Sequence, residues 1–105
     1  MTNVNEDLVS KEKLQQVLQK IEARIQDFKL AIKSEEDRRE DVAKSIYLHE
    51  LYESGQLPKK PMFDHSALIR SRDSIDENIG ILEKAIYGQS EEREKVLKLL
   101  GPVGS

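Results

Sequence analysis

Apolar residues recur along most of this chain at alternating spacings of four and three. A mean spacing of about 3.5 residues is the heptad period, at which helices pack through a continuous apolar seam. The pattern therefore predicts long α-helices that share one seam. Its members are Leu14, Leu18, Ile21, Ile25, Phe28, Ile32, Val42 and Ile46 in the first half, and Leu68, Ile75, Ile79, Leu82, Ile86, Val96 and Leu100 in the second.

Turn-forming residues divide this pattern into two arms. The first helix is expected to begin near Asn5 or Ser10, and no Gly or Pro follows until Gly55, which predicts a helix of roughly 45 residues. Gly55 and the prolines of residues 54–61 then end it. Residues 34–37 (SEED) match a capping box, so the alternative is a helix broken at Ser34.

Asp64 is a suitable N-cap for the second helix. Gly88 either weakens this helix or ends it, and Ser90 would then cap a short third helix. The heptad count crosses Gly88 without a slip, which favours collinear pieces. We therefore expect an N-terminal tail or helix start at residues 1–9, arms at 10–53 and 64–100, a loop at 54–63 and a flexible C-terminus at 101–105.

A short loop makes the two arms antiparallel, so the predicted fold is an all-α, coiled-coil-like helical hairpin. One register pairs Leu18 with Val96 and Ile46 with Leu68, and it places His49 opposite His65. A slip of one heptad satisfies the apolar pattern nearly as well. Both registers therefore stay open at this point.

The apolar residues exceed what one seam buries. They either form a local cluster around the loop or present a surface to a second copy or another helical subunit, which would complete a four-helix bundle. We favour the partner surface because Leu30 and Ile81 have no evident cover within the chain. The residues predicted to bind a partner are Leu30, Leu48, Leu51, Tyr52, Ile69 and Ile81.

Polar residues interrupt the seam at five heptad positions. They either extend to solvent from a loosely packed waist or fix the register and the partner number. We slightly favour the first interpretation. These residues are Glu35, Arg39, Arg72, Gln89 and Arg93.

Composition offers little catalytic chemistry. The 105 residues include no Cys and no Trp, and 35% are charged. The two histidines, His49 and His65, do not complete a known metal or nucleophile motif. We therefore expect no enzyme activity, no catalytic residue, no cofactor and no metal. No apolar run approaches a membrane span and no signal peptide is evident, so an intracellular protein, cytoplasmic or nuclear, is expected.

Charge is distributed unevenly. Residues 54–72 carry four basic side chains against Asp64 alone, although the whole chain has a net charge of −3. Such a basic tip fits nucleic acid or an acidic protein patch, but no stacking aromatics accompany it, and a solvated loop is the favoured interpretation. The four basic residues are Lys59, Lys60, Arg70 and Arg72.

The order of long helix, SGQLPKKP turn (residues 54–61) and return helix is similar in style to N-terminal hairpins of chromatin-complex subunits, such as the inhibitor-of-growth family and adaptors of acetyltransferase complexes. The similarity spans Lys11 to Ile86. It rests on a Pro-Lys-Lys-Pro turn and heptads, which unrelated coiled coils share, so it assigns no family. It would imply a dimerising scaffold; no histone-reading module accompanies it.

These observations favour a non-enzymatic structural or adaptor protein that binds protein, as a homodimer or a helical hetero-oligomer. One alternative is a small monomeric inhibitor or immunity-type protein with four helices. Another is a scaffold subunit of a chromatin or other nucleic-acid-associated complex.

Overall fold

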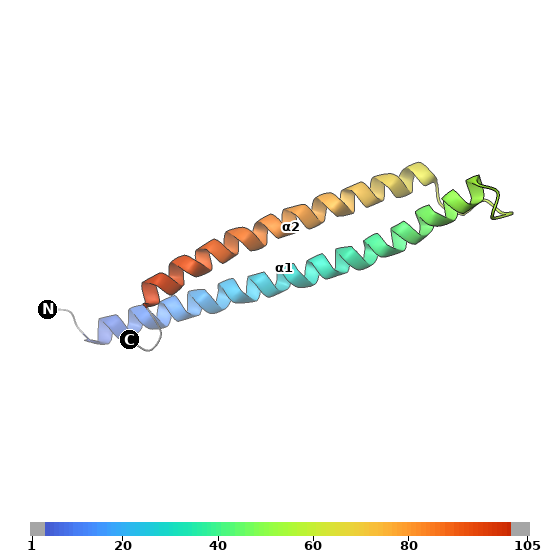
Figure 1. Ribbon diagram of the computed structural model, residues 1–105. Coiled ribbons are helices and arrows are strands. Elements are labelled where there is room, and N and C mark those ends of the chain that lie inside the picture. Colours follow the sequence, from blue (N-terminus) through green and yellow to red (C-terminus); the bar gives the residue numbers. More distant parts are fainter. Residues whose placement is uncertain (1–3, 102–105) are drawn as a thin grey trace. The chain divides into compact units, whose positions relative to one another are not determined.

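A computed structural model describes residues 4–101, with side chains from Ser10 onward. It contains two helices, α1 (Val4–Glu53) and α2 (His65–Leu100), joined by residues 54–64 (Figure 1). No strand occurs within this described range. The prediction of an all-α helical hairpin is therefore confirmed. The C-terminus was predicted to be flexible over residues 101–105, and residues 102–105 lie outside the described part.

Both helices are unbroken. α1 passes through Ser34 without interruption, so the capping-box sequence does not split it. α2 passes through Gly88 and ends at Leu100, so the possible third helix is absent from the described residues. An added Cβ at Gly88 would meet no atom within 4 Å. Without a steric contact that requires glycine there, the surrounding helix-forming residues carry α2 through this position.

A Schellman motif ends α1. Gly55 has a φ of 82°, its N–H donates to the carbonyl of Tyr52, and the N–H of Gln56 donates to the carbonyl of Leu51. The hydroxyl of Ser54 also donates to the Leu51 carbonyl at 3.0 Å. These bonds satisfy carbonyls that the end of a helix leaves free, and they turn the chain away from the α1 axis.

Asp64 begins α2 as its N-cap. Its Oδ2 accepts a hydrogen bond from the N–H of Ala67 at 3.3 Å, and its carbonyl accepts one from the N–H of Leu68 at 3.1 Å. The predicted cap and the observed start of α2 at His65 therefore agree. At the other end, Gly101 adopts a φ of 85° and closes the helix.

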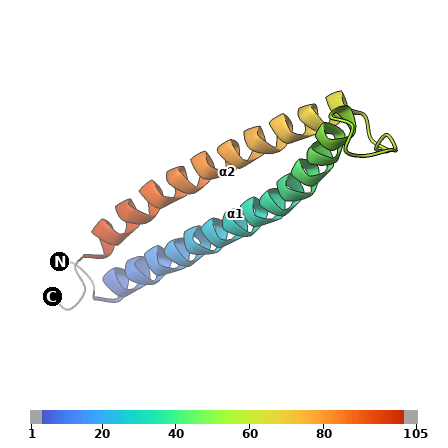
Figure 2. The same cartoon turned by 45° about the vertical axis from the view of Figure 1, so that its right-hand side comes forward.

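The chain divides into two compact units, each of which contains antiparallel parts of α1 and α2 (Figures 1 and 2). The loop unit comprises residues 30–83 and includes the connection between the helices. The terminal unit comprises, within the described range, residues 4–29 and 84–101.

The loop unit buries Ile46, Leu68, Ile75 and Ile79, and Ile75 is the most buried at 2% exposed. All four belong to the predicted seam. In this unit the rings of His49 and His65 stack with centroids 5.3 Å apart, as the register that pairs Ile46 with Leu68 requires. A slip of one heptad would separate the two histidines by about 10 Å along the helices. The unslipped register is therefore the correct one in the loop unit.

The terminal unit has its own apolar cluster. Ile21, Ile25 and Val96 are buried in it. Partly buried seam residues from both helices pack against these three, namely Leu14, Leu18, Ile86 and Leu100. The predicted seam residues thus form the core of this unit as well.

The polar seam residues of the two helices do not face one another. In the confirmed register of the loop unit, Arg39 lies opposite Ile75 and Glu35 lies opposite Ile79. The Arg39 guanidinium extends to the rim of the seam and pairs with Asp76 at 2.6 Å. A long arginine side chain can cover an apolar neighbour with its methylene groups while its charge stays in water. For Arg39 this geometry supports the interpretation that the polar seam residues extend to solvent, whereas Glu35 and Gln89 each keep a side-chain oxygen buried.

We expect Ile75→Ala to lower the free energy of unfolding by about 2–4 kcal/mol, because it removes the most buried side chain of the loop unit. Urea denaturation followed by circular dichroism measures this change. Leu30→Ala is the matched control, since Leu30 is 67% exposed and its truncation should cost less than about 0.5 kcal/mol. Equal losses in the two variants would contradict the described seam.

Gly88→Ala should raise the free energy of unfolding by about 0.5–1 kcal/mol, because alanine reduces the backbone entropy lost on folding into a helix and its Cβ meets open space. The same denaturation assay tests it. A loss of stability would show that α2 does not run straight through residue 88.

Candidate interaction surface

Three of the six residues predicted to bind a partner are exposed in the structure. Leu30 is 67%, Leu48 44% and Ile81 58% exposed, and all three lie in the loop unit. The other three, Leu51, Tyr52 and Ile69, are partly buried. The exposed subset is therefore the part of the prediction that is accessible to another molecule.

Further large apolar side chains are exposed that the predicted partner set did not include. In the loop unit, Met62 is 92%, Phe63 61% and Tyr47 58% exposed. The heptad pattern gives no signal for Met62 and Phe63, because they lie in the connection between the helices. In the terminal unit the exposed apolar side chains are Val17, Tyr87 and Leu99.

Two shallow hollows lie on the loop unit. The first hollow, of about 320 Å³, is lined by Ala31, Ser34, Glu35, Asn78, Ile81 and Leu82. The second hollow, of about 200 Å³, is lined by Ser45, Leu48, His49, Pro61, Met62, Phe63 and Leu68. Both open to solvent, and each borders an exposed apolar side chain, Ile81 at the first and Leu48 at the second. Both hollows are open and shallow, whereas small-molecule sites are usually deep enough to bury most of the ligand.

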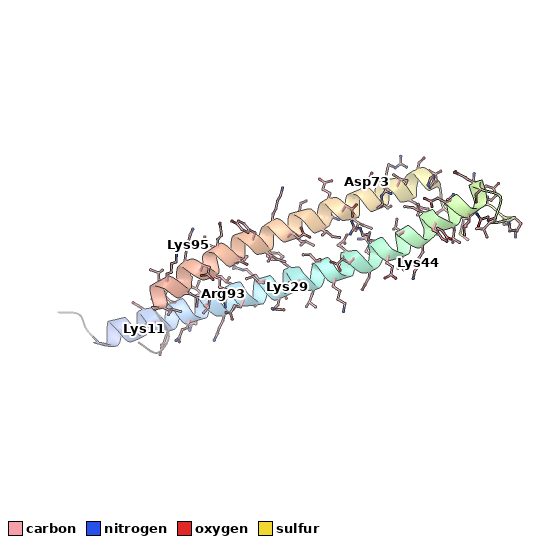
Figure 3. The ribbon with its side chains drawn as sticks, viewed as in Figure 1. Lys11, Lys29, Lys44, Asp73, Arg93 and Lys95 are labelled. Carbon is pink, nitrogen blue, oxygen red and sulfur yellow. The ribbon has the colours of Figure 1, made fainter. Side chains whose placement is uncertain are left out.

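A third hollow, in the terminal unit, is polar. Glu22, Gln26 and Lys29 of α1 line it together with Ser90 and Arg93 of α2. The Arg93 Nε lies 3.3 Å from the Glu22 Oε1, and Figure 3 shows Arg93 on the side of α2 that faces α1. Arg93 lies opposite Ile21 in the predicted pairing, so it repeats the arrangement of Arg39 in the loop unit.

His49 of α1 contacts the connection between the helices. It is only 3% exposed, its ring stacks on that of His65, and its Nε2 is hydrogen-bonded to the carbonyl oxygen of Phe63. A carbonyl oxygen only accepts hydrogen bonds, so Nε2 carries the proton and donates. His49 therefore has a structural role, which the sequence analysis indicated only by placing the two histidines opposite each other.

The four residues of the predicted basic tip differ in their surroundings. Lys59 and Lys60 are exposed in the connection, and Arg70 is exposed on α2. Arg72 is partly buried, and one of its terminal nitrogens lies 3.3 Å from Asp73, which points away from the seam (Figure 3). The basic character of this segment is therefore carried mainly by the first three residues.

Titratable groups give no sign of a reactive cluster in the described part of the chain. No three His, Cys, Asp or Glu side chains there come together as metal ligands. The carboxylate of Glu91 accepts a hydrogen bond from the Tyr87 hydroxyl and repels its phenolate, and both effects raise the pKa of Tyr87 above its usual 10.0. This pair lies on one exposed helix face, four residues apart.

Neither α1 nor α2 includes, over the residues described, a stretch apolar enough to cross a bilayer. No family model, curated protein or solved structure matches this chain. The surface must therefore be interpreted from its own residues.

We expect His49→Ala to loosen residues 54–64, because it removes the ring stack and the hydrogen bond that hold Phe63 to α1. Limited trypsin digestion should then cut faster after Lys59, the basic residue of the connection that is not followed by proline. Tyr47→Ala is the control, since it removes an exposed ring two residues away. Unchanged cleavage in His49→Ala would contradict the proposed role of His49.

Proposed function

We propose that this protein is a non-enzymatic structural or adaptor protein, whose helical hairpin assembles with further helices into a bundle. The observation that carries the proposal is the amount of apolar surface that the hairpin leaves uncovered. The described residues bury seven apolar side chains, whereas nine large ones are exposed, Leu30 and Ile81 among them. Two of them, Ile81 and Leu48, each border a hollow, and exposed apolar side chains that gather in this way are typical of protein contact sites.

The geometry of the loop unit favours helices as partners. Ile81 borders a shallow apolar hollow between α1 and α2, and an added helix would place side chains in such a groove. Two antiparallel helices form half of a four-helix bundle, and they share only one seam. A further helical pair would cover the outward faces that the single hairpin exposes.

The alternative of a monomeric four-helix inhibitor requires α1 to break at Ser34, and α1 is continuous there. A bundle of four helices formed by this hairpin then needs helices other than α1 and α2. The partner class in the proposal is therefore protein, either another copy or a different helical subunit.

Association should be visible in solution. We expect the average mass measured by light scattering to rise with concentration between about 1 and 500 μM, the range in which interfaces of modest size dissociate. Ile81→Glu should weaken this association, because it places a charge on the apolar surface, whereas Ile81→Leu should preserve it.

A different helical subunit would produce the same burial without self-association. In that case the chain, used as bait in its native source, should capture a helical protein that Ile81→Glu does not capture. A folded monomer that captures no protein would contradict the proposed function.

A further inference from the structure

One side of the loop unit carries fewer charged residues than the other. Along α1 a row of residues at spacings of three and four lies beside the main seam, and we call it the second row. Arg38 and Asp41 are its only charged members. The row on the other side of the seam contains four charged residues, Lys33, Glu36, Glu40 and Glu50, with Ala43 and Tyr47. The second row is Ala31, Ser34, Arg38, Asp41, Ser45 and Leu48.

α2 contributes a matching row to the same side. The first hollow joins Ala31 and Ser34 of α1 to Asn78 and Ile81 of α2, so these residues share one face. Residues at the same heptad spacing on α2 are small or uncharged, namely Ala67, Ser71, Ser74, Asn78 and Ile81. Small side chains on two adjacent helices let another pair of helices approach closely.

The order of residues in the second row is complementary to itself when reversed. On reversal, Ala31 corresponds to the larger Leu48, Ser34 corresponds to Ser45, and the positive Arg38 corresponds to the negative Asp41. If a second α1 packs antiparallel about a two-fold axis between Arg38 and Asp41, three kinds of pair form. Arg38 meets Asp41 of the second copy, Ser34 meets its Ser45, and Ala31 meets its Leu48.

We propose that this face is a homodimer interface, and that the occupant of the first hollow is Leu48 of a second copy. The inference rests on the proposed function and identifies its partner. Leu48 is 44% exposed, and the hollow opposite it is lined by Ala31, Ile81 and Leu82. The two-fold symmetry forms this contact twice, and each Leu48 also borders the second hollow of its own chain.

The charges of the second row favour a second copy over an unrelated helix. Arg38 is 63% exposed and lies 2.9 Å from Glu35 of its own chain, which leaves other N–H donors of its guanidinium free for a second carboxylate. Asp41 is exposed and forms no ion pair within the described residues. The antiparallel arrangement gives each Asp41 an arginine and leaves no like charges opposed.

The same axis also suits α2. In the register of the loop unit Arg39 lies opposite Ile75, so residues 74 and 75 of α2 are level with the centre of the second row. Ser71 and Asn78 lie symmetrically about this level. In the dimer Ser71 therefore meets Asn78 of the second copy, which places two uncharged side chains together.

The expected strength follows from the size of the face. The second row spans about 25 Å of helix, and two helices side by side are roughly 20 Å wide. The face then covers about 500 Å² per copy, near the lower limit for specific interfaces. We expect a dimer that dissociates in the micromolar range.

Because the chain has no cysteine, single cysteines report this geometry directly. Ser34→Cys and Ser45→Cys proteins, mixed and oxidised, should form a disulfide-linked dimer at least about tenfold faster than either protein alone. Each protein then carries a single cysteine, so any disulfide that forms joins two molecules. The matched control is a mixture of Glu36→Cys and Ala43→Cys proteins, whose positions are symmetric about the same axis but lie on the charged side.

Leu48→Glu supplies an independent measurement. It should weaken the dimer at least tenfold in sedimentation equilibrium, whereas Tyr47→Glu, a neighbour with similar exposure on the charged side, should change it by less than about twofold. Circular dichroism checks that both variants keep their helix content.

The outcomes separate the two proposals. Association without preferential linkage of residues 34 and 45, or with faster linkage of the control pair, overturns this interface and leaves a bundle-forming protein. Linkage of Ser34→Cys with itself indicates parallel packing and also overturns it. A monomer at every concentration overturns the homodimer, and the failure to capture any helical protein then overturns the proposed function as well.

Discussion

The structure depends on one constraint, which is that two helices share a single seam. A side chain in a two-helix hairpin is covered from one direction only, so burial requires a bulky residue at every seam position and close cover by the residue opposite it. The chain satisfies this requirement with isoleucine at the most buried sites. Among the residues whose side chains are described, five of the seven buried apolar ones are isoleucine, and Ile75 is 2% exposed. The length of the helices then provides the buried contact that a larger number of helices would otherwise provide, because each further turn adds contacts across the seam.

Polar residues enter this seam in a particular way. Arg39 faces Ile75, and in the terminal unit Arg93 extends to Glu22 from a position opposite Ile21. An arginine opposite an isoleucine contributes methylene groups to the seam and a charge to its rim, so the seam continues where its apolar pattern stops. The arrangement has a cost. Glu35 Oε2 and Gln89 Oε1 are buried without a hydrogen-bond partner in the described structure, which limits the stability of the hairpin alone.

The sequence predicted the helices, the loop and the seam because these depend on local periodicity and on strong signals such as Gly55 and Asp64. It left the register open, since a shift of one heptad preserves the apolar pattern. The stacked rings of His49 and His65 decide between the two registers in the loop unit. The spacing of apolar residues also did not show which of the predicted surface residues are exposed. Leu51, Tyr52 and Ile69 flank the seam, and their partial burial depends on side-chain directions that spacing alone does not give.

Exposed apolar residues do not by themselves identify a binding face, because most protein surfaces contain some. The two sides of the loop unit differ more in charge than in hydrophobicity. Glu36, Glu40 and Glu50 keep one side of α1 hydrated, and a dimer formed there would have to remove water from these three carboxylates. On the other side small residues, two hollows and one pair of opposite charges remain. Desolvation costs least where charges are few, so the side of the second row is where the hairpin best tolerates the loss of water that assembly requires.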